Sequence, residues 1–256
     1  MLRSLVGSEM CIRDSFITQT LEDSNIQSNF VQVDEDTRIN VKLKSGQETE
    51  INAPGPKVTH AQFEQLLSQI RRTTKDDIVI VAGSVPKSIP SDAYAQIAQI
   101  TEKTGAQLVV DAEKDLVETV LPYRPLFIKP NKDELEVMFN TTVKSDEEVI
   151  KYGKEILKKG AQSVIISLGG DGAIYVDQHQ SIKAVNPQGH VVNTVGSGDS
   201  TVAGMVAGLS MGLNVDEAFQ QAVASGTATA FSEDLATRDA IENIKSQVTI
   251  SVLDGE

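Results

Sequence analysis

The sequence predicts an α/β protein with a mostly parallel central sheet and helices on both faces of that sheet. Between residues 60 and 170, four amphipathic segments are each followed by a short apolar run. This order is typical of parallel strands that are joined by crossover helices. The apolar runs consist almost entirely of Val, Ile and Leu, as strands do when both of their faces are buried.

The other elements follow from their local patterns. Residues 16–22 read as a helix, and apolar and polar residues alternate from 26 to 51 with a turn signal at Ser45-Gly46. The alternation predicts a small antiparallel layer, a lid, over about 28–52. The helix–strand units are predicted at 60–72 and 77–83, 91–105 and 106–113, 114–120 and 126–131, and 145–160 and 161–170. Strands at 173–177 and 181–185 and helices at 201–211 and 216–231 complete the pattern.

The composition excludes several classes of partner and site. The chain carries 36 acidic residues against 23 Lys and Arg, which gives a net charge of −13. Such a surface repels nucleic acids and anionic membranes, so we expect neither as a partner, and an anionic ligand needs a local trap. The single cysteine, Cys11, excludes an intramolecular disulfide and a multi-cysteine zinc site. No apolar stretch approaches the roughly 18 residues of a membrane-spanning helix, and we expect a cytoplasmic protein.

Residues 1–15 differ from the rest of the chain. They are too short and too polar for a signal peptide, and they run into the helix at Phe16 without a capping residue. We therefore expect a non-native leader over 1–15 and one domain over 16–256. The alternative is a native terminus without stable structure.

Polar residues and glycines follow each of five apolar runs. Ligands bind at the carboxyl ends of the strands in an open parallel sheet, so we expect these residues on one rim. Taken singly, each is equally a turn residue. The residues are Gly83-Ser84, Asp111, Lys129-Pro130-Asn131, the run from Ser167 to Gly172, and the run from Gly196 to Asp199.

The segment NTVGSGDS, from Asn193 to Ser200, is the most informative in the chain. Its two glycines open a helix of small residues, whose unpaired N–H groups and dipole attract an anion. An Asp at this place can accept the proton of a hydroxyl group that attacks a phosphoryl group. Asp199 is therefore a candidate general base, and the alternative is that it caps the helix. The chain contains no P-loop and no Rossmann fingerprint.

Together, the segments NAPGP, VAGSVP, FIKPNKDELE, SLGGDGA and NTVGSGDS resemble the ribokinase/PfkB family of sugar kinases, from about Ser24 to the C-terminus. The resemblance implies a ribokinase-like fold in which the lid is a remnant. It also implies transfer of the γ-phosphoryl group of ATP, with Mg²⁺, to the 6-hydroxyl of D-fructose 1-phosphate. D-tagatose 6-phosphate is the alternative acceptor. A homodimer that forms through the lid is a further expectation.

The resemblance implies a role for each matching residue. Asp199 is the expected catalytic base, and Glu134 is expected to hold Mg²⁺, largely through water. Gly196, Ser197 and Gly198 are expected to form the anion hole. Arg38, Asn40 and Ser84 are expected, with Asp199, to contact the substrate. The expected ATP-binding residues are Lys129, Asn131, Ser167, Leu168, Gly169, Gly170, Asp171, Gly172 and Thr227.

The same residues have simpler interpretations. Asn131 is equally the cap of a helix, and Glu134 an acid in its first turn. Arg38 and Lys129 are equally solvent-exposed residues of the lid and of a strand end.

The family pattern also contains segments that this sequence lacks. Family members begin with a strand that carries a substrate Asp and continue to a Gly-Gly-Lys-Gly-Asn segment that clasps the sugar. We therefore expect an intact phosphoryl-transfer half, an incomplete sugar site, weak nucleotide binding and poor turnover. An inactive nucleotide-binding fragment is the alternative from another functional class. Arg38 and Ser84 argue against a kinase of nucleosides or vitamins.

Overall fold

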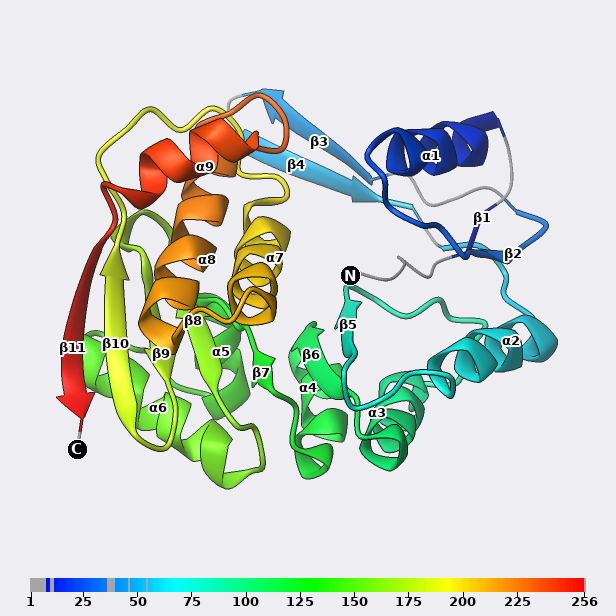
Figure 1. The fold of residues 1–256 in the computed structure, drawn as a ribbon, viewed down its shortest axis with the longest axis horizontal. Coiled ribbons are helices and arrows are strands. Elements are labelled where there is room, and N and C mark those ends of the chain that lie inside the picture. Colours follow the sequence, from blue (N-terminus) through cyan, green and yellow to red (C-terminus); the bar gives the residue numbers. More distant parts are fainter. Residues whose placement is uncertain (1–7, 10–11, 36–39, 46, 54, 256) are drawn as a thin grey trace. The chain divides into compact units, whose positions relative to one another are not determined.

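Figure 1 shows the computed structural model, which describes residues 8–9, 12–35, 40–45, 47–53 and 55–255. The chain divides into two units. The first comprises residues 1–74 and 84–105, and the second comprises residues 75–83 and 106–256. None of the described helices is long and apolar enough to cross a membrane.

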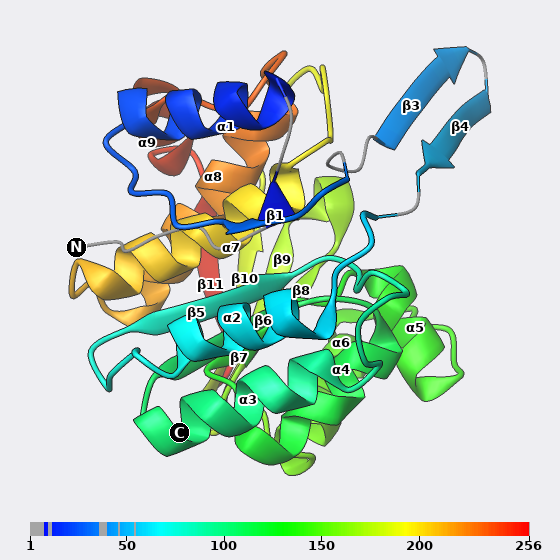
Figure 2. The ribbon, with the colours of Figure 1, turned by 90° about the vertical axis from the view of Figure 1, so that its right-hand side faces the viewer.

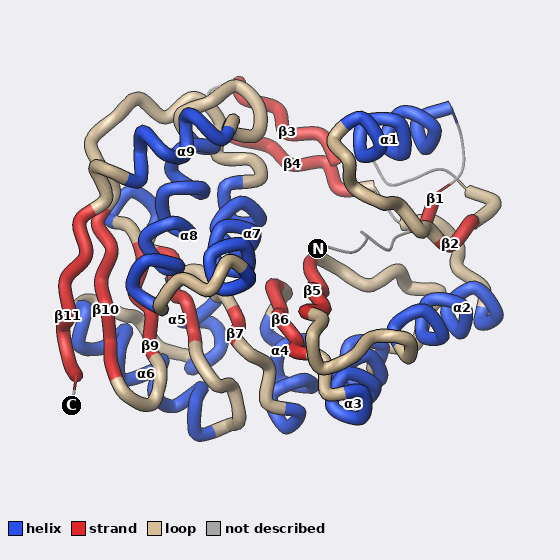
Figure 3. Tube along the Cα trace, in the orientation of Figure 1, coloured by secondary structure: helices blue, strands red, loops and turns tan. Residues whose placement is uncertain are grey.

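A seven-stranded sheet forms the centre of the second unit, in the order β11-β10-β9-β8-β7-β6-β5 (Figure 3). The strands β5 to β8 run parallel to one another, and β9, β10 and β11 continue the sheet in antiparallel pairs. The four predicted parallel strands are thus confirmed. The strands are β5 (Ile78–Ala82), β6 (Gln107–Asp111), β7 (Phe127–Ile128), β8 (Val164–Ser167), β9 (Ala173–Val176), β10 (Gln180–Val185) and β11 (Thr249–Gly255).

Helices cover both faces of this sheet (Figure 2). On one face, Met205 and Phe219 belong to a buried apolar cluster that includes Phe127 and Ile165 of the sheet. On the other face, α6 packs so closely that a Cβ atom added to Gly153 would lie 2.9 Å from Val176. Burial on both faces explains why the central strands are uniformly apolar. The helices are α4 (Lys114–Val120), α5 (Lys132–Phe139), α6 (Asp146–Lys158), α7 (Ser197–Ser210), α8 (Val215–Ala230) and α9 (Arg238–Lys245).

The first unit contains the predicted antiparallel layer as a hairpin of two strands. Its strands pair from Asn40 opposite Asn52 to Ser45 opposite Gln47, so the turn falls at the predicted place. The helix that follows is fixed by a capping box in which Thr59 and Gln62 bond each other's backbone N–H groups. The elements are β1 (Ser8–Glu9), α1 (Ile12–Asp23), β2 (Val31–Gln32), β3 (Asn40–Ser45), β4 (Gln47–Asn52), α2 (His60–Ile70) and α3 (Ala93–Thr104).

Several boundaries differ from the sequence prediction. Helix α1 begins at Ile12 rather than at Phe16, and α7 begins at Ser197 rather than at Thr201. Gly196 has a φ of +78°, and this left-handed residue starts α7 one turn earlier than the apolar period indicates. The sequence analysis missed α9 and β11. No residue of α9 is fully buried, and β11 is an edge strand, so both elements lie at the margin of the core, where Ile241, Ile244 and Ile250 pack against it only in part.

Candidate active site

The carboxyl ends of three neighbouring parallel strands place Asp111, Lys129 and Ser167 along one edge of the sheet. The backbone N–H of Lys129 donates to the carbonyl of Val110 at 3.2 Å, and that of Ser167 donates to the carbonyl of Pro130 at 3.1 Å. The strand pairing therefore continues past the apolar cores into the polar residues. This edge is where an open parallel sheet binds its ligands.

Lys129 and Asp111 form an ion pair at this edge, with 3.2 Å between Nζ and Oδ2. The Lys129 side chain is 7% exposed, so its interpretation as a solvent-exposed residue at a strand end is wrong. Burial raises the pKa of the Asp111 carboxyl group, the Lys129 ammonium opposes this rise, and the nearby charge of Asp199 adds to it. The same ammonium lies 3.3 Å from the place where a Cβ atom on Gly198 would sit. A buried cation thus lies beside the start of α7.

The start of α7 leaves two backbone donors open. Ser197 uses its N–H and its hydroxyl group on the carbonyl of Thr194, at 3.3 and 2.9 Å, while the N–H of Ser200 is the first to reach back to Gly196. The N–H groups of Gly198 and Asp199 therefore have no acceptor within the helix. With Lys129 alongside, they are a candidate anion trap on an acidic protein.

Asp199 is the third residue of α7, and its side chain is exposed. The N-cap is Gly196, and no side chain caps the helix. The alternative that Asp199 is the helix cap is therefore wrong. Asp199 itself carries one of the two open N–H groups, and its carboxylate makes no capping hydrogen bond to the helix.

Asn131 and Glu134 form the capping box of α5. The Glu134 N–H donates to Asn131 Oδ1, and the Asn131 N–H donates to Glu134 Oε2, both at 2.8 Å. The simpler interpretation of both residues as helix-capping groups is thus confirmed as a structural fact. It leaves the Oε1 atom of Glu134 for another partner.

The residues Ser167 to Gly172, which we call the glycine loop, connect β8 to β9. The loop closes through a hydrogen bond of 2.8 Å from the Leu168 N–H to the Gly172 carbonyl. Asn186 holds it from outside: its Nδ2 donates to the Gly169 carbonyl at 3.0 Å, and its Oδ1 accepts from the Thr227 hydroxyl at 2.8 Å. The structure thereby brings Thr227 and the glycine loop together.

Sequence reasoning assigned no role to Asn186 and named Asp111 only as a residue at a strand end. The signal for Asp111 was its position after the apolar run LVV. Asn186 has a weaker signal, because an Asn before a Pro at the end of a strand is typical of a turn.

The chain is similar to several known carbohydrate kinases. The sequence profile described as pfkB family carbohydrate kinase matches residues 13–240. The chain is 41% identical to the 1-phosphofructokinase of Bacillus subtilis, over 93% of this chain and 78% of that protein. It is 35% identical to the D-tagatose-1-phosphate kinase of Bacillus licheniformis, over 93% of this chain and 79% of that protein.

The chain belongs to the pfkB family of carbohydrate kinases. Among solved structures, a candidate phosphofructokinase from Staphylococcus aureus shares 75% identity with it, with a TM-score of 0.91 over all of this chain and 84% of that one. The phosphofructokinase-2 of Escherichia coli in complex with substrates and products gives a TM-score of 0.90 at 25% identity, over 96% of this chain and 82% of that one. This pfkB kinase is therefore an ATP-dependent phosphotransferase with a ribokinase-like fold, acting on a sugar.

Of the four residues predicted to contact the sugar substrate, Asn40 and Ser84 fall in the first unit of this pfkB kinase, and Asp199 falls in the second. Ser84 is exposed and follows Gly83, which has a φ of +83°. Asn40 begins β3, and Arg38 lies outside the described residues. Asp199, the glycine loop, Lys129, Asn131 and Glu134 all belong to the second unit. The predicted phosphoryl-transfer residues are thus carried by one unit.

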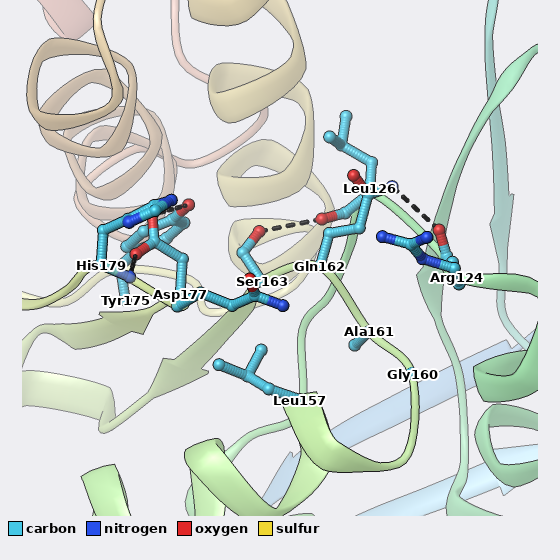
Figure 4. Close-up of a pocket in the computed structure, with 11 residues that line it drawn as sticks. Arg124, Leu126, Leu157, Gly160, Ala161, Gln162, Ser163, Tyr175, Asp177 and His179 are labelled. Carbon is cyan, nitrogen blue, oxygen red and sulfur yellow. Dashed lines mark hydrogen bonds between the residues drawn. The ribbon is translucent and has the colours of Figure 1, made fainter.

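A cavity of about 420 Å³ opens at the other edge of the sheet, near the amino ends of β7 and β8 (Figure 4). The Tyr175 hydroxyl donates to Asp177 at 3.0 Å there, and burial raises the pKa of the Tyr175 phenol. Ser163 donates to the Leu126 carbonyl at 2.9 Å. These hydroxyl groups are thus already paired, and the cavity lies away from the strand ends that carry Lys129 and Ser167.

Proposed function

We propose that this kinase transfers the γ-phosphoryl group of ATP to the 6-hydroxyl group of D-fructose 1-phosphate. The products are D-fructose 1,6-bisphosphate and ADP. One observation carries the proposal: the exposed Asp199 side chain belongs to the same helical turn as two open N–H groups, and this turn lies beside the buried ammonium of Lys129. The name and identity of the Bacillus subtilis relative support the choice of acceptor.

Asp199 acts as the general base. It takes the proton of the 6-hydroxyl group as the oxygen attacks the γ-phosphorus. The new bond joins O6 to phosphorus, and the bond between that phosphorus and the bridging β–γ oxygen breaks, leaving its electron pair on ADP. The N–H groups of Gly198 and Asp199 stabilise the negative charge on the transferred group, with Ser197 and Gly196 shaping the turn. Lys129 adds a positive charge at the same place.

The residues present fit a magnesium ion that is held mainly by nucleotide phosphates and water. Among the described residues, no group of three or more His, Cys, Asp or Glu side chains could hold a metal. Mg²⁺ commonly binds through one or two carboxylates and keeps several waters, and the free Oε1 of Glu134 offers such a hard oxygen. When bound, Mg²⁺ would neutralise charge on the phosphates. Glu134 would orient its water shell.

The nucleotide would lie along Lys129, Asn131 and the glycine loop, with Thr227 behind the loop. Ligand binding at the carboxyl ends of parallel strands supports this placement. The sugar phosphate would be held by Arg38, Asn40 and Ser84, because a guanidinium binds two phosphate oxygens at once.

D-tagatose 6-phosphate is the second candidate acceptor. The chain is 32% identical to the tagatose-6-phosphate kinase of Staphylococcus epidermidis, over 85% of this chain and 72% of that protein. ADP release, measured with each sugar phosphate in turn, separates the two. We expect the higher kcat/KM with D-fructose 1-phosphate, and the reverse order would establish the alternative.

Replacing Asp199 tests the chemical step. We expect Asp199→Asn to lower kcat by about 10²–10⁴-fold. Asp239→Asn, which changes an acid in the first turn of α9, is the matched control and should keep wild-type turnover. Wild-type turnover by Asp199→Asn would contradict the proposal. Poor turnover by the chain itself stays a prediction, which the same assay checks.

We also propose that two copies associate through the hairpin β3–β4. An isolated two-stranded hairpin is marginal in water, and among the described residues these strands pair only with each other. A tetrameric form of the Escherichia coli phosphofructokinase-2 is known among the structural relatives. Sedimentation of the whole chain should show a dimer, and a monomer at all concentrations would contradict this.

A further inference from the structure

Asn186 directly follows β10 and touches two elements at once. Its Nδ2 donates to the carbonyls of Gly169 and Gly170, at 3.0 and 3.4 Å, and its Oδ1 accepts the Thr227 hydroxyl at 2.8 Å. The Thr227 residue is 6% exposed in α8. A single side-chain amide therefore ties the glycine loop to a buried helix.

The partners of Asn186 allow only one orientation of its amide. Two carbonyl oxygens can only accept, so they require the NH₂ group, and the Thr227 hydroxyl supplies the donor that the amide oxygen needs. A carboxylate in this place would face two carbonyl oxygens with no proton to share. An alanine would leave the carbonyls and the hydroxyl without these bonds.

The glycine loop depends on this contact because its tip has few others. Its base is held by the pairing of Ser167 with Ala173, and a Cβ atom on Gly172 would lie 1.9 Å from the Ala184 carbonyl. At the tip, by contrast, a Cβ atom on Gly169 or Gly170 would meet nothing within 4 Å. The Asn186 amide is the side-chain group that fixes the two carbonyls of the tip.

The other end of the contact leads to the anion trap. Gly226, the neighbour of Thr227, packs so closely on α7 that its Cβ atom would lie 2.9 Å from the Ser197 carbonyl and 2.2 Å from Thr201 Oγ1. The α8 segment that anchors Asn186 is thus in contact with the first turn of α7. The spacing between glycine loop and anion trap is set through this segment.

We propose that Asn186 is a positioning residue for ATP: it holds the glycine loop at the distance from the α7 N-terminus that a bound nucleotide requires. The inference rests on the proposed function. Asn186 acts through the loop and takes no part in the chemistry. Its loss should therefore weaken nucleotide binding, while the step at Asp199 and the affinity for the sugar phosphate stay intact.

Three variants should weaken the contact of Asn186 to different degrees. We expect Asn186→Ala, which removes the three hydrogen bonds of the amide, to raise the KM for ATP roughly tenfold, a change that corresponds to about 1.4 kcal/mol. We expect a larger rise for Asn186→Asp, through repulsion from the two carbonyls, and a smaller one for Thr227→Val, which only frees the amide to turn. For Asn186→Ala, the KM for D-fructose 1-phosphate and kcat should each stay within about threefold of wild type, a split that a general loss of stability would not produce.

The control is Asn243→Ala, which removes an exposed Asn from α9 and should leave both KM values unchanged. Titration calorimetry with a non-hydrolysable ATP analogue, without sugar, measures nucleotide binding apart from turnover. An unchanged analogue affinity in Asn186→Ala, or equal rises in both KM values, would overturn the inference. A wild-type chain that binds the analogue but releases no ADP contradicts the proposed function alone, and the calorimetry then decides the role of Asn186. A wild-type chain that does not bind the analogue overturns both.

Discussion

At the scale of single residues, some side chains of the candidate site also stabilise the local backbone, and others do not. Asn131 and Glu134 cap α5, and Ser197 closes the turn before α7. Asp199 makes no such bond to the helix, and Asp111 carries a charge that burial disfavours. An ionisable group whose charge is disfavoured by its surroundings is a candidate functional residue, because stability alone does not account for its presence.

Asp111 gives a prediction for the pH dependence of stability. Because burial raises its pKa above 3.8, the folded chain binds the proton more tightly than the unfolded chain does. The free energy of unfolding therefore falls as the pH rises from about 3.8 through the raised pKa. Asp111→Asn removes this fall. Urea unfolding at a series of pH values measures this loss of pH dependence. We expect the variant to be less stable than wild type at pH 7, because the buried Lys129 ammonium has then lost its partner.

The same variant should lose activity. Without Asp111, nothing fixes the Lys129 ammonium beside Gly198, and we expect kcat/KM for ATP to fall about tenfold. A variant as stable as wild type at neutral pH would show that the cost of burying the two charges outweighs the attraction of the ion pair.

A substitution at Glu134 tests whether this residue helps to bind Mg²⁺. Glu134→Gln keeps an oxygen for the Asn131 N–H and so keeps the capping box, but it removes the charge. Because outer-shell groups typically affect metal affinity by 10–100-fold, we expect the Mg²⁺ concentration for half-maximal rate to rise roughly tenfold. Asp133→Asn, in the same helical turn, is the control. Equal shifts in both variants would assign the effect to general charge.

At the scale of elements, the spacing of apolar residues predicted the strands and helices that are buried in the core. It did not predict features that depend on backbone conformation or on contacts between distant residues. Runs of apolar residues predicted the strands β5 to β8, and amphipathic segments predicted the helices α2, α3, α4 and α6. The early start of α7 depends on the backbone conformation of one residue, Gly196, which no side-chain period reports. The contacts of Asn186 join residues that are up to 41 positions apart in the sequence, and no local pattern encodes them.

The close packing of α7 on α8 is open to a direct test. A Cβ atom on Gly204 would lie 2.6 Å from Ser225 Oγ and 2.9 Å from the Ala222 Cα atom, which is backbone and cannot turn away. Alanine favours a helix over glycine by about 1 kcal/mol, but overpacking costs about 1–3 kcal/mol. We expect Gly204→Ala to lower the free energy of unfolding, measured in urea. Gly170→Ala, which meets no atom within 4 Å, should leave it unchanged. Equal stability of the two variants would mean that the helices separate easily.

At the scale of the whole molecule, the residues proposed for ATP and two of those proposed for the sugar phosphate fall in different units. The residues proposed for ATP lie in the second unit, whereas Asn40 and Ser84 lie in the first. The net charge of −13 opposes both anionic ligands, so each must be held by local donors such as the α7 N-terminus. If local donors hold each ligand, each ligand should protect only the backbone amides near its own binding residues.

Hydrogen exchange of the backbone amides measures these footprints, because a bound ligand suppresses the local openings that allow exchange. We expect the non-hydrolysable ATP analogue with Mg²⁺ to slow exchange in peptides that contain Lys129, the glycine loop and Gly198, all in the second unit. D-fructose 1-phosphate should slow exchange in peptides that contain Asn40 and Ser84, and at Asp199. Unphosphorylated D-fructose, which lacks the anion, is the control and should do neither. Slower exchange at Asn40 and Ser84 with the ATP analogue alone would contradict this division of ligands between the units, since it would place nucleotide contacts in the unit assigned to the sugar phosphate.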